Sequence, residues 1–163
     1  MTREEVYDEA KEKFSRYLEE KRHRKTPERF AILSEIYARD DHFDVEMLYL
    51  ELKKKNYQIS RATVYNTLDL LLDCGLAIKQ QFGNNTALYE KAYGYRQHDH
   101  LICNYCRKVL EFCDPRLQKT QDMVGELFGF EVTQHALTLY GNPEVDENGI
   151  CQRCSQYVNA FVD

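Results

Sequence analysis

Two Cys-x-x-Cys pairs, Cys103 with Cys106 and Cys151 with Cys154, have the spacing in this 163-residue chain that most directly indicates chemistry. Two intervening residues let both thiols of a pair face one ion, and two pairs complete a tetrahedral site of four sulfur ligands. Two disulfides are the alternative, but the charged N-terminus lacks the apolar segment of a secretory signal and favours a reducing compartment. The pattern therefore predicts structural zinc that closes a loop of 44 residues between Cys106 and Cys151.

A His-x-His element lies just before the first cysteine pair. If residues 97–102 form a strand, its period of two places His98 and His100 on one face and Asp99 on the other. Two imidazoles on one face can chelate a borderline divalent ion such as iron(II), manganese or zinc. An isolated His-x-His can also be merely solvated, so this second site requires further ligands.

Charge and hydropathy limit the partners of the chain. It carries 22 basic and 27 acidic residues, a net charge of −5, which argues against a general nucleic-acid coat and requires that any DNA contact be local. Residues 21–29 form such a patch, with five basic side chains and one acid, although a run of this kind is often only a solvated face. No apolar run is long enough to span a bilayer, so we expect a cytoplasmic protein with no membrane role.

The N-terminal half has the signals of four helices followed by a β-hairpin. A helix is expected up to about residue 22, two more lie between residues 26 and 55, and a fourth ends near Cys74. Residues 76–89 then predict a hairpin around Gly83-Asn84-Asn85. This order is typical of a winged helix-turn-helix domain, with residues 91–96 as a hinge. The residues expected to cap the helices are Thr2, Thr26, Asp44 and Ser60.

The fourth helix has two different faces. Val64, Leu68, Leu71 and Leu72 form an apolar side, while a second side offers groups suited to phosphates and base edges. A partly buried tyrosine and a solvated asparagine would explain the second side equally well. Its candidate DNA-contacting residues are Arg61, Thr63, Tyr65 and Asn66.

The C-terminal half predicts a small α/β domain. We expect strands at 97–102, 108–112 and 131–140, with a helix at 116–128. A short sheet with an open edge commonly pairs with its twin, so a homodimer is expected. The predicted fold class is therefore α+β, with a winged-helix domain over residues 1–91 and a dimerisation domain over residues 92–163.

The order of these motifs closely resembles the ferric uptake regulator family over residues 14–154. The resemblance rests on Arg61 to Leu68, the run from His98 to Cys106, Val109 to Phe112, and the late Cys-x-x-Cys. It implies a homodimeric, metal-dependent transcription factor that binds a double-stranded DNA operator, usually as a repressor, and is not an enzyme. It also implies that the four cysteines hold structural zinc. Within the basic patch, Arg24 and its neighbours are expected to contact phosphate or the minor groove of the DNA.

Carried over position by position, the resemblance implies a regulatory site for Fe²⁺ or another divalent metal such as Mn²⁺ or Zn²⁺. Glu111 replaces the aspartate typical of peroxide-sensing relatives, which favours the iron-responsive branch, with peroxide- and zinc-responsive regulators as alternatives. A further family site would use Gln97, Asp99, Gln118 and His135 here. Two of these are amides, which are poor metal ligands, so that site is expected to be degraded. The implied regulatory ligands are His42, Glu90, His98, His100 and Glu111.

Two other classes of function use the same residues. A metallohydrolase would need an open coordination position beside a substrate pocket, and it would leave the winged helix unexplained. A metal- or haem-binding storage protein could keep the fold without binding an operator. Operator affinity with and without metal separates these two from a regulator whose hinge is locked by the metal.

Overall fold

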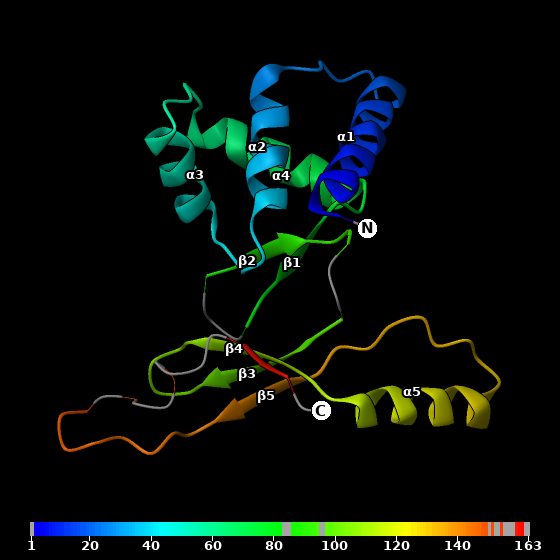
Figure 1. Cartoon of the computed structure of the whole chain (residues 1–163), viewed down its shortest axis with the longest axis vertical. Coiled ribbons are helices and arrows are strands. Elements are labelled where there is room, and N and C mark those ends of the chain that lie inside the picture. The colour runs from blue at the N-terminus through cyan, green and yellow to red at the C-terminus, as the bar shows by residue number, and fades with distance from the viewer. Residues whose placement is uncertain are drawn as a thin grey trace. The chain divides into compact units, whose positions relative to one another are not determined.

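The chain folds into two compact units, Met1–Tyr95 and Arg96–Asp163. The computed structural model describes residues 2–82, 86–94, 97–149, 151, 154 and 159–161 (Figure 1). The expected boundary at residues 91 and 92 lies four residues before this division. Within the described ranges, no helix is long and apolar enough to cross a membrane.

Four helices make up most of the N-terminal unit, and each begins at the residue that the sequence indicates. They are α1 (Arg3–Glu20), α2 (Pro27–Ala38), α3 (Val45–Lys54) and α4 (Arg61–Asp73). The side chains of Thr2, Thr26, Asp44 and Ser60 each accept a hydrogen bond from a backbone N–H in the first turn. These N-terminal caps satisfy groups that the helix itself leaves unpaired, and therefore fix where each helix starts.

The wing is an antiparallel hairpin of β1 (Ala77–Gln80) and β2 (Leu88–Lys91). Residues 83–85, at its predicted turn, lie outside the described residues. Phe43, just before α3, forms a bridge with Tyr89 of β2 and stacks on its ring at a centroid distance of 6.0 Å. The two strands of the wing pair with each other, and the contact between Phe43 and Tyr89 also joins the wing to the helical core.

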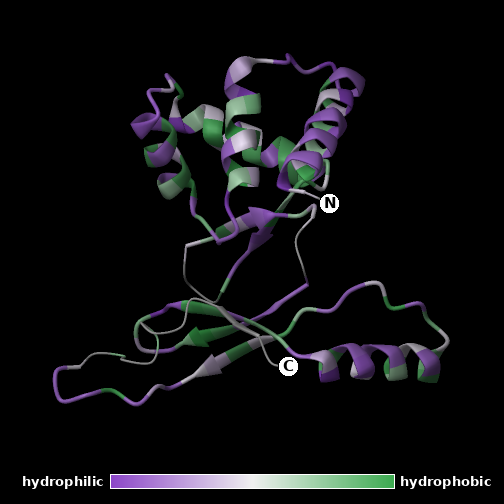
Figure 2. Ribbon diagram, viewed as in Figure 1, coloured by the Kyte–Doolittle hydropathy of each residue, from purple (hydrophilic) through white to green (hydrophobic). Residues whose placement is uncertain are grey.

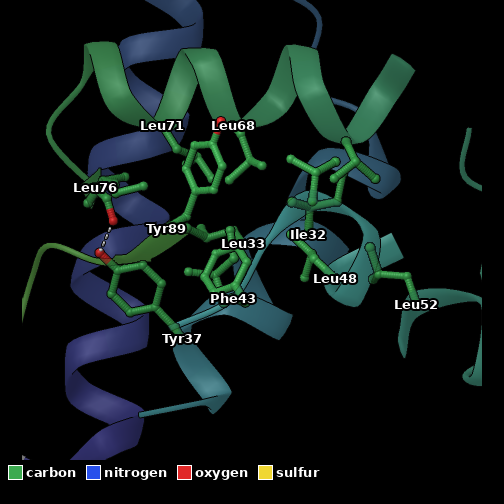
Figure 3. Packing of buried hydrophobic residues seen from close by; sticks show 14 of the residues in the cluster. Ile32, Leu33, Tyr37, Phe43, Leu48, Leu52, Leu68, Leu71, Leu76 and Tyr89 are labelled. Atoms are coloured by element: carbon green, nitrogen blue, oxygen red, sulfur yellow. Dashed lines mark hydrogen bonds between the residues drawn. The ribbon is translucent and has the colours of Figure 1, made fainter. Parts of the chain in front are cut away.

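The four helices and the wing enclose one apolar core (Figure 3). Val64, Leu68 and Leu71 of α4 face into it, as the helical pattern predicts. Tyr37 is also buried there, and its hydroxyl donates a hydrogen bond of 2.9 Å to the carbonyl oxygen of Leu76, so its polar atom is satisfied. This core orients α4 while leaving its other face in solvent.

Contacts with α1 and with the residues just after α2 hold the segment that leaves the wing. The Tyr93 hydroxyl donates to the Glu9 carboxylate of α1, and Lys91 Nζ donates a hydrogen bond of 2.6 Å to Asp40, two residues after α2. Gly94 adopts φ +72°, and a Cβ there would come within 2.5 Å of Val6. Glycine is therefore required for this close approach.

The C-terminal unit holds a four-stranded sheet in the order β5-β3-β4-β6. Strands β3 (Asp99–Cys103) and β4 (Val109–Cys113) are antiparallel, whereas β5 (Thr138–Gly141) and β6 (Asn159–Phe161) each pair in parallel. Helix α5 (Pro115–Phe128) extends beyond the sheet instead of covering it (Figure 1). The predicted α+β class is confirmed.

In this unit one predicted strand is wrong in extent and one strand was missed. The last predicted strand, 131–140, is reduced to Thr138–Gly141, so His135 lies before the strand and not within it. Side chains occupy backbone groups of the preceding segment: Gln121 donates to the Val132 carbonyl, and the Leu137 N–H donates to Asp99. Those groups are not available to a β-ladder. Strand β6 was not predicted at all.

Replacing Tyr37 with phenylalanine should lower the free energy of unfolding by about 1 kcal/mol, because the Leu76 carbonyl would lose one of its two donors and keep only the Ala92 N–H at 3.1 Å. Thermal or urea unfolding of the two proteins measures this difference. Tyr57→Phe is the matched control, since Tyr57 is 43% exposed in the same unit. Equal losses in the two variants would contradict a specific role for the Tyr37 hydrogen bond.

Candidate metal centres and nucleic-acid interface

The sulfur atoms of Cys103, Cys106, Cys151 and Cys154 gather at one point of the C-terminal unit, all within 4.8 Å of one another. The Sγ atoms of Cys103 and Cys151 are 3.8 Å apart, far beyond a disulfide bond of about 2.05 Å. Four sulfurs at about 2.3 Å from a central zinc would be separated by about 3.8 Å, so the cluster fits a tetrahedral ion. The disulfide alternative is not what the structure contains, because all four are free cysteines.

The environment of the four sulfur atoms favours ionisation of one thiol, that of Cys103. Burial acts to raise the pKa of Cys103, but the backbone N–H groups of Cys106 and Tyr105 and the neighbouring thiols lower it to about 7. The Cys106 N–H lies 3.4 Å from the Cys103 sulfur. Burial and the sulfurs of Cys103 and Cys106 raise the pKa of Cys154 to about 11. A cation is needed before all four can be thiolates.

Each unit brings together part of the predicted regulatory ligand set. In the N-terminal unit, His42 Nε2 lies 3.6 Å from Glu90 Oε2, while Glu90 Oε1 accepts 2.6 Å from Gln80. His42 follows α2, and Glu90 lies on β2. The bridge between Phe43 and Tyr89 positions both, since each ligand is the immediate neighbour of a bridge residue.

In the C-terminal unit, the His98 and His100 rings lie 4.8 Å apart on one side of the chain. Glu111 of β4 is the residue paired with His100 across the antiparallel ladder, and paired residues project to the same face. These three positions therefore share a face, as the period of two predicts.

Asp99 points to the other face and enters a hydrogen-bonded network. Its carboxylate accepts from the Leu137 N–H at 2.9 Å and lies 3.1 Å from His135 Nε2. The other ring nitrogen of His135 lies 2.6 Å from the Gln121 amide oxygen, and the Gln97 amide donates to the His135 carbonyl. Both imidazole nitrogens thus have protein partners.

Sequence reasoning selected Gln118 for this region and missed Gln121. The Gln118 amide turns to Asp122 on its own helix, whereas Gln121, one turn further, reaches both His135 and the Val132 carbonyl. Gly125 allows the segment to come this close, because a Cβ there would be 2.7 Å from the Phe130 carbonyl. The i+3 spacing of Gln118 and Gln121 was a signal that either could face the segment.

Among the predicted DNA contacts, Tyr65 is 53% exposed on α4, and Arg61 and Asn66 are exposed beside it. The Arg61 guanidinium, although exposed, already has partners in the protein: it donates to both Glu46 oxygens at 2.6 and 2.8 Å and lies 4.1 Å from the Tyr49 ring centre. Arg24 lies in the connection between α1 and α2 and is exposed. Arg61 thus joins α4 to α3, whereas Tyr65 and Asn66 face solvent.

The two remaining cysteines lie outside the sulfur cluster. Cys74 is half-buried at the end of α4, and burial raises the pKa of its thiol, so it is a weak nucleophile. Cys113 is half-buried at the end of β4.

Comparison with known proteins adds the following matches. The model described as the ferric uptake regulator family matches residues 20–140, a range that begins where α1 ends. The ferric uptake regulation protein of Campylobacter jejuni is 34% identical over 137 residues, which are 83% of this chain and 87% of that protein. The peroxide operon regulator of Bacillus subtilis is 31% identical over 134 residues, covering 82% and 86%.

A solved structure of the ferric uptake regulator from Pseudomonas aeruginosa with manganese is also similar. Its TM-score is 0.69 at 29% sequence identity, with 78% of this chain and 95% of that chain covered. The likeness therefore extends from the helical unit into the sheet.

Replacing Cys151 with alanine should abolish stoichiometric zinc and lower the melting temperature, because binding free energy at a structural zinc site is folding free energy. Metal analysis of anaerobically purified protein, with thermal unfolding, measures both effects. Cys113→Ala is the matched control, a half-buried cysteine of the same sheet outside the cluster. Retention of zinc by Cys151→Ala would refute the four-sulfur site.

Proposed function

Because this chain belongs to the ferric uptake regulator family, whose members are metal-responsive transcriptional regulators, we propose that it is an iron-responsive repressor controlled by ligands from both units. The observation that carries the proposal is that each unit preforms one part of the set, His42 with Glu90 in one and His98, His100 and Glu111 in the other. Three imidazoles and two carboxylates form a mixed shell suited to a divalent ion of intermediate softness.

Convergence of both parts on one ion would tie the wing to the sheet through the hinge. His42 and Glu90 are fixed to the DNA-binding unit by the Phe43–Tyr89 bridge, so restraining them restrains α4 as well. If the DNA-binding arrangement holds the ion 100-fold more tightly than the other arrangements of the units, metal occupancy stabilises it relative to them by about 2.7 kcal/mol. Metal occupancy would thereby become operator affinity.

Glu111 supports iron as the metal. Peroxide-sensing relatives typically carry an aspartate at this position, whereas this chain carries a glutamate. Manganese and zinc remain chemically acceptable to the same ligands. The Asp99–His135 network supports the view that the second family site is degraded, because amides stand at two of its positions and both His135 nitrogens face protein groups.

The exposed face of α4 is suited to a major groove. Tyr65 and Asn66 would read base edges and thymine methyl groups, while Thr63 and Arg24 would contact the DNA backbone. Arg61 would have to leave Glu46 to do the same. We therefore propose that its main role is to hold the start of α4 against α3.

Operator affinity should rise about 100-fold when iron(II) is added to the zinc-loaded protein, within the usual range of allosteric coupling. The duplex would be selected from a random library under anaerobic conditions, and fluorescence anisotropy would then measure affinity with iron(II), manganese or zinc. His42→Ala should retain the metal-free affinity and lose the increase. Glu126→Ala, an exposed carboxylate of α5, is the control. The proposal would be contradicted if the wild-type protein bound the operator with the same affinity in the presence and absence of metal.

A second copy of the chain is the partner that the C-terminal unit favours. Helix α5 combines hydrophobic and hydrophilic residues along its length (Figure 2). The side chains of Met123, Leu127, Phe128 and Phe130, in α5 and the segment after it, are 61–74% exposed. A largely apolar hollow of about 550 Å³ on the sheet is lined by Leu101, Leu110, Phe112 and Leu139, among others. Large apolar side chains that gather on the surface of one unit commonly mark an interface. A dimer would also supply two α4 helices for a two-fold operator.

Leu127→Glu should weaken the dimer at least tenfold, because a buried interface leucine would become a charge without a partner. Sedimentation equilibrium of the full chain measures the dissociation constant. Leu50→Glu is the matched control, since Leu50 is 46% exposed on α3 of the other unit. A monomeric wild type, or equal effects of both variants, would exclude this dimer surface.

A further inference from the structure

A hollow of about 590 Å³ lies in the N-terminal unit where the connection between α1 and α2 meets the start of α4. Arg22, Arg24 and Arg29 line it. We call this the basic hollow.

The positive charge of the basic hollow is not neutralised within the described chain. Lys25 pairs with Glu19, but no described carboxylate forms an ion pair with any of the three arginines. Among the described residues, the Arg29 side chain donates to the Arg24 carbonyl oxygen. This acceptor is neutral, so the positive charge of Arg29 is not compensated. Glu28 is the single carboxylate on the rim. Three guanidinium groups around one acid favour an anion.

One residue that lines the basic hollow carries a buried hydroxyl. Thr67 lines the hollow and is fully buried, and its Oγ1 has no hydrogen-bond partner among the described residues. Leaving a buried hydroxyl without a partner costs about 1–3 kcal/mol. A bound ligand that supplied an acceptor for this hydroxyl would remove the cost. The N-terminus of α4, capped by Ser60, adds partial positive charge at the same rim.

Arg22 is held in a conformation that glycine would adopt more easily. Its φ is +57°, in the left-handed region, immediately after α1. The His23 N–H reaches back to the Leu18 carbonyl at 2.8 Å, the pattern in which a C-terminal helix cap usually employs glycine. Arginine at this position therefore costs backbone energy while placing a guanidinium at the hollow.

We propose that the basic hollow binds a single phosphate group, with the arginines neutralising its charge and the Thr67 hydroxyl donating to one oxygen. The phosphate is a backbone phosphodiester of duplex DNA, and the inference therefore rests on the proposed function. Docking of this group would set how far α4 enters the groove, because Thr67 lies on α4 itself. Arg22 and Arg29 belong to the basic patch of residues 21–29 that the sequence indicates, whereas Thr67 is not among the DNA contacts that the sequence predicts.

The test measures two ligands with the full-length, metal-loaded protein. Inorganic phosphate is titrated into isotope-labelled protein in chloride buffer while NMR follows the Thr67 amide. A selected duplex and a scrambled duplex are titrated at several salt concentrations. Binding of phosphate with its largest shifts at Thr67, and loss of affinity for both duplexes in the hollow variants, are the expected results.

Thr67→Val and Arg22→Gly separate binding from folding. Both should melt at or above the wild-type temperature, since one removes an unpartnered hydroxyl and the other relieves a left-handed arginine. Both should nevertheless bind the two duplexes about tenfold more weakly. Arg22→Gly and Arg29→Gln should each reduce the salt slope by about one. Arg16→Gln, an exposed arginine of α1 outside the hollow, is the control.

The possible failures are distinguishable. Wild-type DNA affinity and wild-type phosphate shifts in Thr67→Val and Arg22→Gly would overturn the inference. Phosphate binding that needs Thr67, combined with unchanged DNA affinity in the variants, would overturn the DNA assignment and identify a site for free phosphate. A wild type that binds phosphate at Thr67 but no duplex would refute the proposed function while leaving the anion site intact.

Discussion

The C-terminal unit depends on the close approach of the sulfur atoms of four cysteines, because its described residues contain almost no other buried core. The buried apolar side chains cluster in the N-terminal unit, whereas the buried cluster of the C-terminal unit consists of Cys103, Cys151 and Cys154. A small sheet without an enclosed core cannot offset its conformational entropy by apolar burial alone. A metal that closes the long loop, and a second copy that covers the exposed face of α5, would each supply what is missing.

The N-terminal unit solves a different physical problem. Its core is complete within one chain, and the buried side of α4 is anchored by Val64, Leu68 and Leu71. The opposite side can therefore keep Tyr65 exposed at little cost to stability. Two local costs lie at the basic hollow, namely the buried Thr67 hydroxyl and the left-handed Arg22. Such costs are tolerated because the core determines the surrounding backbone.

Coupling between the units would use ligands that each unit has already oriented. The bridge between Phe43 and Tyr89 fixes His42 and Glu90, and the ladder between β3 and β4 sets His100 opposite Glu111. On the other face of β3, Asp99 is bonded to His135 and Leu137, so the strand is held from behind as well. Little rearrangement within either unit would then be needed on metal binding, and the free energy of binding could act on the hinge.

Local sequence determined the helix caps, the two faces of α4, the face shared by His98 and His100, and the spacing of the thiols within each Cys-x-x-Cys motif. These follow from short-range geometry, in which one side chain meets a backbone group or neighbour a few residues away. The matching spacing of the two motifs also predicted that they share one ion, although they are far apart in the chain. Only the tertiary structure decided that Arg61 pairs with Glu46, that Gln121 and not Gln118 reaches His135, and that β5 starts at Thr138. Each of these depends on contacts between residues distant in sequence, where several partners are chemically equivalent and the packed backbone selects one.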